Sequence, residues 1–156
     1  MKKQRIFAGL WAAVLLCAVL LTAGCGSGEI LASQAAQDTW GICLAAEDPT
    51  SVGATIRCVQ NGGSPDGELT YGSPFFLERL EGDQWEEVKT VEPTAWTMIG
   101  YTLEMGSSHK WEVSWESIYG ELLPGNYRFC KEFLAYRGPG DYDKRVYYAE
   151  FEVPEE

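Results

Sequence analysis

Short stretches in which apolar and polar residues alternate dominate the chain beyond residue 40. A period of two predicts β-strands with one buried face, and the glycine, proline, asparagine and aspartate residues between the stretches predict turns. The predicted strands cover residues 40–47, 54–60, 75–80, 85–88 and 97–103, one strand with Trp111, Val113 and Trp115 on one face, one that begins at Asn126, and one with Tyr147, Ala149, Phe151 and Val153 on one face. Seven to eight short antiparallel strands with one apolar face each need a second sheet as cover, so we expect an all-β sandwich.

The first residues follow a different pattern. Lys2, Lys3 and Arg5 form a cationic head, and residues 6–24 are uncharged and mostly apolar. These are the marks of a secretory signal peptide. The segment ends Leu-Thr-Ala-Gly before Cys25, which resembles the lipobox of bacterial lipoproteins; the resemblance implies cleavage before Cys25 and a lipid on its sulfur. Two alternatives remain at this point, a retained membrane-spanning helix and an ordinary signal peptide cut elsewhere.

These segments divide the chain into three parts. Residues 1–24 are predicted to be the signal peptide, and residues 39–156 form one domain of ordinary size. Residues 25–38 are mostly small and polar and predict a flexible tether. The signal peptide holds the only stretch that predicts a helix.

Charge narrows the range of partners. The formal net charge is −11, and removing the three basic residues of the signal peptide makes it −14, because all 23 acidic residues lie beyond Cys25. An acidic surface repels nucleic acid. It also repels anionic headgroups, so we expect the lipid to be the membrane contact, on the outer face of the cell membrane.

A motif before the penultimate strand supports a specific sandwich. Leu122-Leu123-Pro124-Gly125-Asn126-Tyr127 resembles a tyrosine corner, in which the tyrosine hydroxyl bonds back to upstream backbone. A wider pattern comprises Tyr71-Gly72, Phe76-Leu77-Glu78-Arg79-Leu80, Trp85, Tyr119-Gly120-Glu121-Leu122, Gly125-Asn126-Tyr127-Arg128-Phe129 and Lys131. The pattern resembles the bacterial immunoglobulin-like domain family over residues 44–153. The resemblance implies an immunoglobulin-like β-sandwich and no particular activity.

Three cysteines remain in the domain. If the first two strands form a hairpin that turns at Thr50 and Ser51, Cys43 lies opposite Cys58, which predicts a disulfide between them. The alternatives are a Cys58–Cys130 bridge and three free thiols. Register decides between them, because a slip of one residue moves a side chain to the other face.

No residue pattern points to catalysis or to a cofactor. His109 is the only histidine, and it lies at the start of a predicted strand. We find no phosphate-binding loop, nucleophile elbow or zinc-ligand spacing. Asp141 and Asp143 lack the other residues of a calcium loop and are predicted to lie in a solvated loop between the last two strands. We therefore expect a protein that is not an enzyme and holds no metal.

The aromatic residues suggest a surface for binding. Most of them can fill the core, but Tyr136, Tyr142 and Tyr148 are predicted to lie on or beside the last hairpin, where aromatic rings could contact a ligand. The expected partner is another protein or a cell-wall glycan. The alternative functions are a proteinase inhibitor, since inhibitors of similar fold share the Pro-Gly-x-Tyr turn, and a carbohydrate-binding module.

Overall fold

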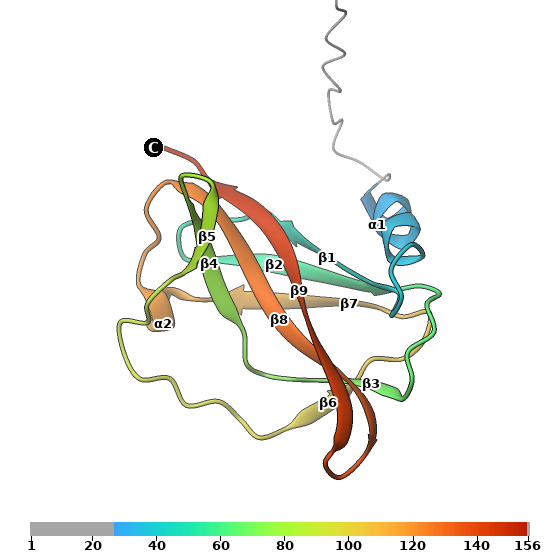
Figure 1. Cartoon of the computed structure of the whole chain (residues 1–156). Helices are drawn as coiled ribbons and strands as arrows, with labels where there is room; N and C mark the ends of the chain where they lie inside the picture. The colour runs from blue at the N-terminus through green and yellow to red at the C-terminus, as the bar shows by residue number, and fades with distance from the viewer. Residues whose placement is uncertain (1–26, 156) are drawn as a thin grey trace, which may run out of the picture.

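The computed structural model describes residues 27–155 (Figure 1). In chain order, the elements in this part are α1 (Ser27–Ala35), β1 (Ile42–Glu47), β2 (Gly53–Gln60), β3 (Glu68–Gly72), β4 (Phe76–Glu81), β5 (Gln84–Glu87), β6 (Gly100–Thr102), β7 (Ser108–Ser114), α2 (Glu116–Tyr119), β8 (Gly125–Gly138) and β9 (Asp141–Val153). The predicted all-β sandwich is confirmed.

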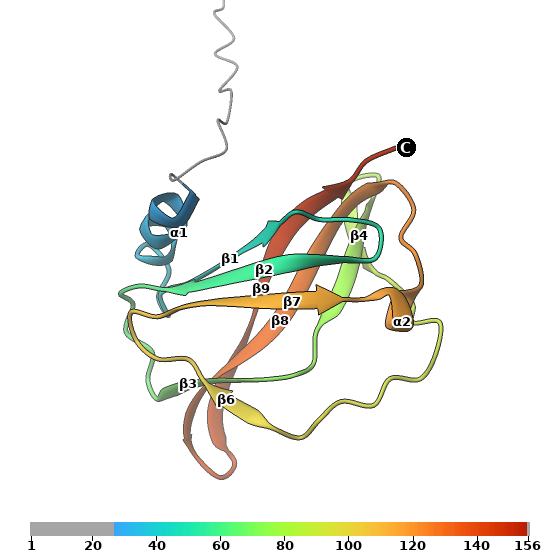
Figure 2. The same ribbon diagram turned by 180° about the vertical axis from the view of Figure 1, so that it is seen from behind.

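The strands form two antiparallel layers. The smaller sheet has the order β1-β2-β7, and the larger has the order β5-β4-β8-β3-β6, with β9 paired to β8. Strand β8 spans 14 residues and organises the larger sheet. Its first half pairs with β4, its second half with β3, and its other edge with β9 along nearly its whole length. The long β8–β9 ribbon crosses in front of the three-stranded layer in Figure 1 and behind it in Figure 2.

The core lies between the two inner faces. Every second residue of β8 points inward, and Tyr127, Phe129 and Phe133 are almost completely buried there. Ile56 of β2 and Trp115, which follows β7, meet them from the other layer. Burial of such large side chains is the main stabilising contribution to a sandwich of this size.

Two strand predictions differ from the structure. Strand β3 was missed, because it is short and lies between two segments rich in glycine and proline. Residues 141–143 were predicted to be a loop, but they begin β9, and Tyr136 lies opposite Tyr142 in the β8–β9 ladder. Arg137 holds this end of the hairpin by ion pairs to Asp141 and Asp143, each at 2.8 Å.

The prediction of a flexible tether over residues 25–38 is also wrong for most of that segment. Residues Ser27–Ala35 form helix α1. Leu31 and Ala35 lie one turn apart and are buried with Val59 on the outer face of the smaller sheet. The side chain of Asn61 donates a hydrogen bond to the carbonyl oxygen of Ala32 at 2.9 Å. Packing against the sheet thus stabilises a helix that the composition does not predict, as is usual for short helices.

Asp38 fixes the connection between α1 and β1. Its Oδ2 accepts hydrogen bonds from the backbone N–H of Trp40 and Ile42 and from the Tyr147 hydroxyl, the last at 2.6 Å. Burial acts to raise the pKa of Asp38, but these hydrogen bonds outweigh it and hold the pKa below its ordinary value. The carboxylate therefore joins the start of the domain to β9.

Candidate functional site

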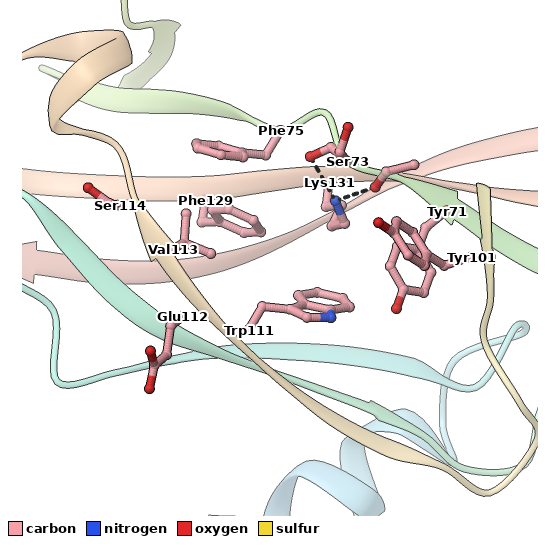
Figure 3. Close-up of a pocket in the computed structure, with 11 residues that line it drawn as sticks. Tyr71, Ser73, Phe75, Tyr101, Trp111, Glu112, Val113, Ser114, Phe129 and Lys131 are labelled. Carbon is pink, nitrogen blue, oxygen red and sulfur yellow. Dashed lines mark hydrogen bonds between the residues drawn. The ribbon is translucent and has the colours of Figure 1, made fainter. Parts of the chain in front are cut away.

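One side of the sandwich is open and forms an aromatic cleft of about 510 Å³. Its lining comes from both sheets: Tyr71 and Gly72 of β3, Ser73 and Phe75 of the β3–β4 connection, Tyr101 of β6, Trp111, Glu112, Val113 and Ser114 of β7, and Phe129 and Lys131 of β8. Figure 3 shows Lys131 in the middle of this aromatic cleft, with Trp111 facing it from the opposite layer.

The aromatic cleft arises where β8 changes partners. Residues 127–130 pair with β4 and residues 133–136 pair with β3, so the chain at Lys131 has neither partner. Between β3 and β4, the connection through Ser73 and Pro74 leaves carbonyl groups without a strand partner. Partly buried carbonyl groups that leave a ladder need another donor. This break in the sheet therefore leaves both a hollow and a need for hydrogen-bond donors within it.

Lys131 supplies these donors. Its Nζ donates to the carbonyl oxygens of Gly72 at 2.8 Å, Pro74 at 3.1 Å and Ser73 at 3.5 Å. It also lies 5.4 Å from the ring centroids of both Tyr71 and Trp111, within the range of a cation–π interaction. The lysine is only 5% exposed. Its ammonium group therefore holds the β3–β4 connection in place and forms the floor of the aromatic cleft.

Burial lowers the pKa of the Lys131 amine to about 8. The sequence pattern could have drawn attention to this residue, because it is the one charged residue among the inward positions 127, 129, 131, 133 and 135 of β8. The pattern did not reveal what it contacts.

Aromatic rings stand on both sides of Lys131. On one side, Tyr71 stacks on Tyr101 with ring centroids 5.4 Å apart and lies 5.1 Å from Trp111. On the other side, Phe75 stacks on Phe129 at 5.0 Å. Tyr101 is 43% exposed and Trp111 is half-buried. The mouth of the aromatic cleft therefore offers ring faces that a ligand could cover.

Strand β7 forms one rim of the aromatic cleft and is the last strand of its sheet. Two backbone hydrogen bonds lie at the two ends of its pairing with β2. The N–H of Gln60 donates to the carbonyl oxygen of Ser107 at 2.9 Å, and the N–H of Trp115 donates to the carbonyl oxygen of Val52 at 3.0 Å. Bonded and non-bonded positions alternate along an antiparallel ladder. The odd-numbered residues between 107 and 115 are therefore those whose backbone groups face β2.

The even-numbered residues of β7 present their backbone groups to the other side. In the described part of the chain, no further strand pairs with this edge. The N–H and C=O groups of Lys110 and Glu112 therefore face outward along the rim of the aromatic cleft. We call this the β7 edge (backbone of residues 108–114). An unpaired edge of this kind can accept another strand.

Charged side chains cover the outer face of the smaller sheet. Glu47 of β1 accepts from Arg57 of β2 at 2.6 Å and from Lys110 of β7 at 2.8 Å. These two hydrogen bonds hold the pKa of Glu47 below its ordinary value. Glu112 points away from the aromatic cleft (Figure 3) and makes no ion pair with any residue that the structure describes.

The three tyrosines that the sequence suggested as a binding surface lie elsewhere. Tyr136, Tyr142 and Tyr148 are 37%, 45% and 50% exposed, on the outer face of the β8–β9 ribbon. Tyr148 is already engaged: the guanidinium of Arg128 lies 4.0 Å from its ring centroid and 4.0 Å from that of Trp85. Only Tyr136 and Tyr142, which lie opposite each other, form a pair near the hairpin end.

Tyr127 has the geometry of a tyrosine corner. Its ring is buried and stacks on Phe151 at 5.6 Å, and its hydroxyl donates to the carbonyl oxygen of Leu123 at 2.7 Å. The hydrogen bond fixes the turn that leads from α2 into β8.

The disulfide predicted between Cys43 and Cys58 is not formed, and the predicted hairpin register is wrong by one residue. Cys58 lies opposite Leu44, and Cys43 lies opposite Val59. Because neighbouring residues of a strand face opposite sides, Cys58 points into the core and Cys43 toward α1. The pairing of the two strands is centred on Ser51, not between Thr50 and Ser51 as predicted; within the connection, Asp48 adopts a positive φ of 49°.

The alternative Cys58–Cys130 bridge is absent too, and the three cysteines within residues 27–155 are free thiols. Burial raises the pKa of Cys58 to about 12 and, together with Glu78, that of Cys130 to about 12. Such thiols carry almost no thiolate at neutral pH and are poor nucleophiles.

The remaining predicted residues add no chemistry. Cys25 lies outside the described residues. Ser107 is the hydrogen-bond partner of His109, at 3.1 Å. Among residues 27–155, no three His, Cys, Asp or Glu side chains are grouped so that they could bind a metal ion. Neither helix in this range is long and apolar enough to span a membrane.

Two antiparallel sheets packed face to face, with a tyrosine corner before the long strand, define an immunoglobulin-like β-sandwich. Residues 38–152 match the family model described as the bacterial Ig-like domain, and the chain belongs to that family. Neither the curated proteins nor the solved structures contain a significant match to the chain.

Proposed function

We propose that this protein is a non-enzymatic interaction module, held at the outer face of the cell membrane by a lipid on Cys25, that binds an extended polypeptide along the β7 edge. The observation that supports the proposal is the position of the β7 edge at the rim of the aromatic cleft. Recognition of an extended strand needs main-chain groups for hydrogen bonds and a pocket for alternate side chains. The β7 edge offers the first and the aromatic cleft the second.

The chemistry of the aromatic cleft favours binding over catalysis. The Lys131 ammonium is occupied by backbone carbonyls, and the other lining side chains are aromatic, aliphatic or hydroxyl groups apart from Glu112. The exposed ring of Tyr101 and the half-buried ring of Trp111 supply contact area at a low cost in conformational entropy. An apolar or aromatic side chain of the bound strand would fit between them.

Helix α1 supports an anchored arrangement in which the domain lies close to the bilayer. Ser27 begins the docked helix only two positions after Cys25, a spacing of at most about 7 Å of extended chain. In this arrangement the end of the β8–β9 hairpin, which lies at the other end of the molecule from α1 in Figure 1, would point away from the membrane.

A site-specific photo-crosslink tests the binding site. A benzoylphenylalanine residue is placed at Ser114, an uncharged residue of the β7 edge, or at Tyr142, on the outer face of the other sheet, in the full chain in its native membrane. We expect an adduct with a polypeptide from position 114 and none from position 142, because only the former lies on the β7 edge and borders the aromatic cleft. Adducts from position 142 alone would place the binding surface on the hairpin. The lack of any adduct from position 114 would contradict the proposal.

A further inference from the structure

The β7 edge carries side chains that complement themselves. On the outer face of this strand, Lys110 and Glu112 are the two charged residues, and they occupy neighbouring outward positions. Antiparallel pairing of two copies of the same strand sets each residue opposite its mirror position about a two-fold axis. The position of the axis therefore decides which charges meet.

An axis through Trp111 brings opposite charges together. Lys110 then lies opposite Glu112 of the second copy, and Glu112 opposite Lys110 of the second copy. An axis through Lys110 or through Glu112 would instead place two like charges opposite each other, which is destabilising. An axis between two residues would place an outward-facing backbone group opposite one already bonded to β2.

The hydrogen-bonding groups agree with the same register. The outward backbone groups of β7 belong to the even-numbered residues, and an axis through Trp111 sets Lys110 opposite Glu112 and Ser108 opposite Ser114, which are all even-numbered. Each of these pairs can exchange N–H···O=C bonds across the axis. The two smaller sheets then join into one six-stranded sheet.

The aromatic cleft adds apolar contact to this pairing. Trp111 points inward and is half-buried, and it forms a non-bonded pair with Trp111 of the second copy, the kind of pair in which side chains lie closest. Tyr101, which is 43% exposed, lines the same mouth. Lys110 keeps its ion pair with Glu47, since an ammonium group has three donors. Glu112, which has no ion-pair partner among residues 27–155, gains one across the axis.

We infer that the partner strand at the β7 edge is β7 of a second copy of this chain, paired in the antiparallel register centred on Trp111. The inference rests on the proposed function and names the partner of the same site. Pairing of this kind would link two anchored domains side by side on one membrane, or link domains on two membranes.

Charge-reversal variants test this register. The purified full chain in mild detergent is studied by sedimentation equilibrium, as the wild type and as Lys110→Glu and Glu112→Lys. We expect the wild type to dimerise and each single variant to dimerise at least about tenfold more weakly, because each places two pairs of like charges across the axis. A mixture of the two variants should regain dimerisation to within about threefold of the wild type, since in the mixed dimer both pairs are opposite charges again.

The matched control is Lys144→Glu. Like Lys110→Glu, it reverses one surface lysine and removes one ion pair of 2.8 Å, here to Glu132 on the other sheet, and it should leave dimerisation unchanged. Recovery in the mixture cannot come from a misfolded variant.

A wild type that stays monomeric, single variants that dimerise like the wild type, or a mixture that does not recover would each overturn the inference. If the chain is monomeric but position 114 still forms an adduct with a different polypeptide, the β7 edge remains the binding site and only the identity of the partner is wrong.

Discussion

Replacement of Trp115 by alanine should lower the free energy of unfolding by about 3–5 kcal/mol, the largest effect that we expect for any single substitution in this domain. Trp115 is completely buried, and its ring stacks on Phe151 of β9 with centroids 5.1 Å apart. Its indole N–H donates to the carbonyl oxygen of Ser51 at 3.0 Å. The substitution would therefore open a cavity between the layers and remove one of the two hydrogen bonds that the Ser51 carbonyl oxygen accepts; the other comes from the N–H of Leu122 at 2.9 Å.

The consequence should be visible by thermal unfolding. A loss of this size is a large part of the 5–15 kcal/mol that stabilises a typical domain, and it corresponds to a fall of about 10–20 °C in Tm. Trp85→Ala is the matched control, since Trp85 lies on the outer face and stacks on Arg128; we expect it to cost about 1 kcal/mol. Equal effects at the two tryptophans would mean that the layers do not pack through Trp115.

Between about pH 8 and pH 10.5, Lys131 should make the free energy of unfolding of the wild type rise with pH, and replacement of Lys131 by methionine should remove this rise. The pKa of Lys131 is about 8 in the folded protein and 10.5 in the unfolded chain. In that interval the unfolded chain holds a proton that the folded chain has lost, so the free energy of unfolding increases with pH. At 1.36 kcal/mol for each pH unit, the rise is at most about 3 kcal/mol.

Other groups change stability in the opposite direction, and for that reason the difference between wild type and variant is the quantity to measure. The pKa values of Cys58 and Cys130 are raised from 9.0 to about 12, so their contribution to stability falls as the pH rises above 9. Both thiols remain in Lys131→Met. Denaturant titrations at several pH values, with reductant present, should give curves that diverge above pH 8. A Lys144→Met control should follow the wild type, and parallel curves for Lys131→Met would contradict a buried lysine.

The strand pattern could be predicted from the sequence because it depends on local alternation. In β8, the inward residues 127, 129, 133 and 135 are apolar, and this alone indicates which face meets the core. The tyrosine corner is local as well, since Tyr127 and Leu123 are four residues apart.

The register of the first hairpin could not be predicted in the same way. An odd number of residues, 48–54, separates the last paired residues of the two strands, and this sets Cys58 opposite Leu44 instead of Cys43. The positive φ of Asp48 in this connection is not visible in the alternation pattern. Helix α1 was missed because its stability comes from contact with Val59, a residue of another element.

The aromatic cleft depends on contacts between distant parts of the chain. Lys131 and the carbonyl group of Gly72 are 59 residues apart, and they meet because β8 changes from β4 to β3 as its partner at Lys131. No pattern within a short window carries this information. A charged residue at an inward strand position was the one available signal.

Hydrogen exchange along β7 tests most directly whether its edge is free in the single chain. The measurement uses the Lys110→Glu variant, which we expect to be monomeric. The backbone amides of Trp111 and Val113 face β2, and those of positions 110 and 112 face solvent. The first two should exchange at least about a hundredfold more slowly than the other two. Slow exchange at all four amides in a monomer would show that another part of the chain covers this edge, and would contradict its role as a binding site.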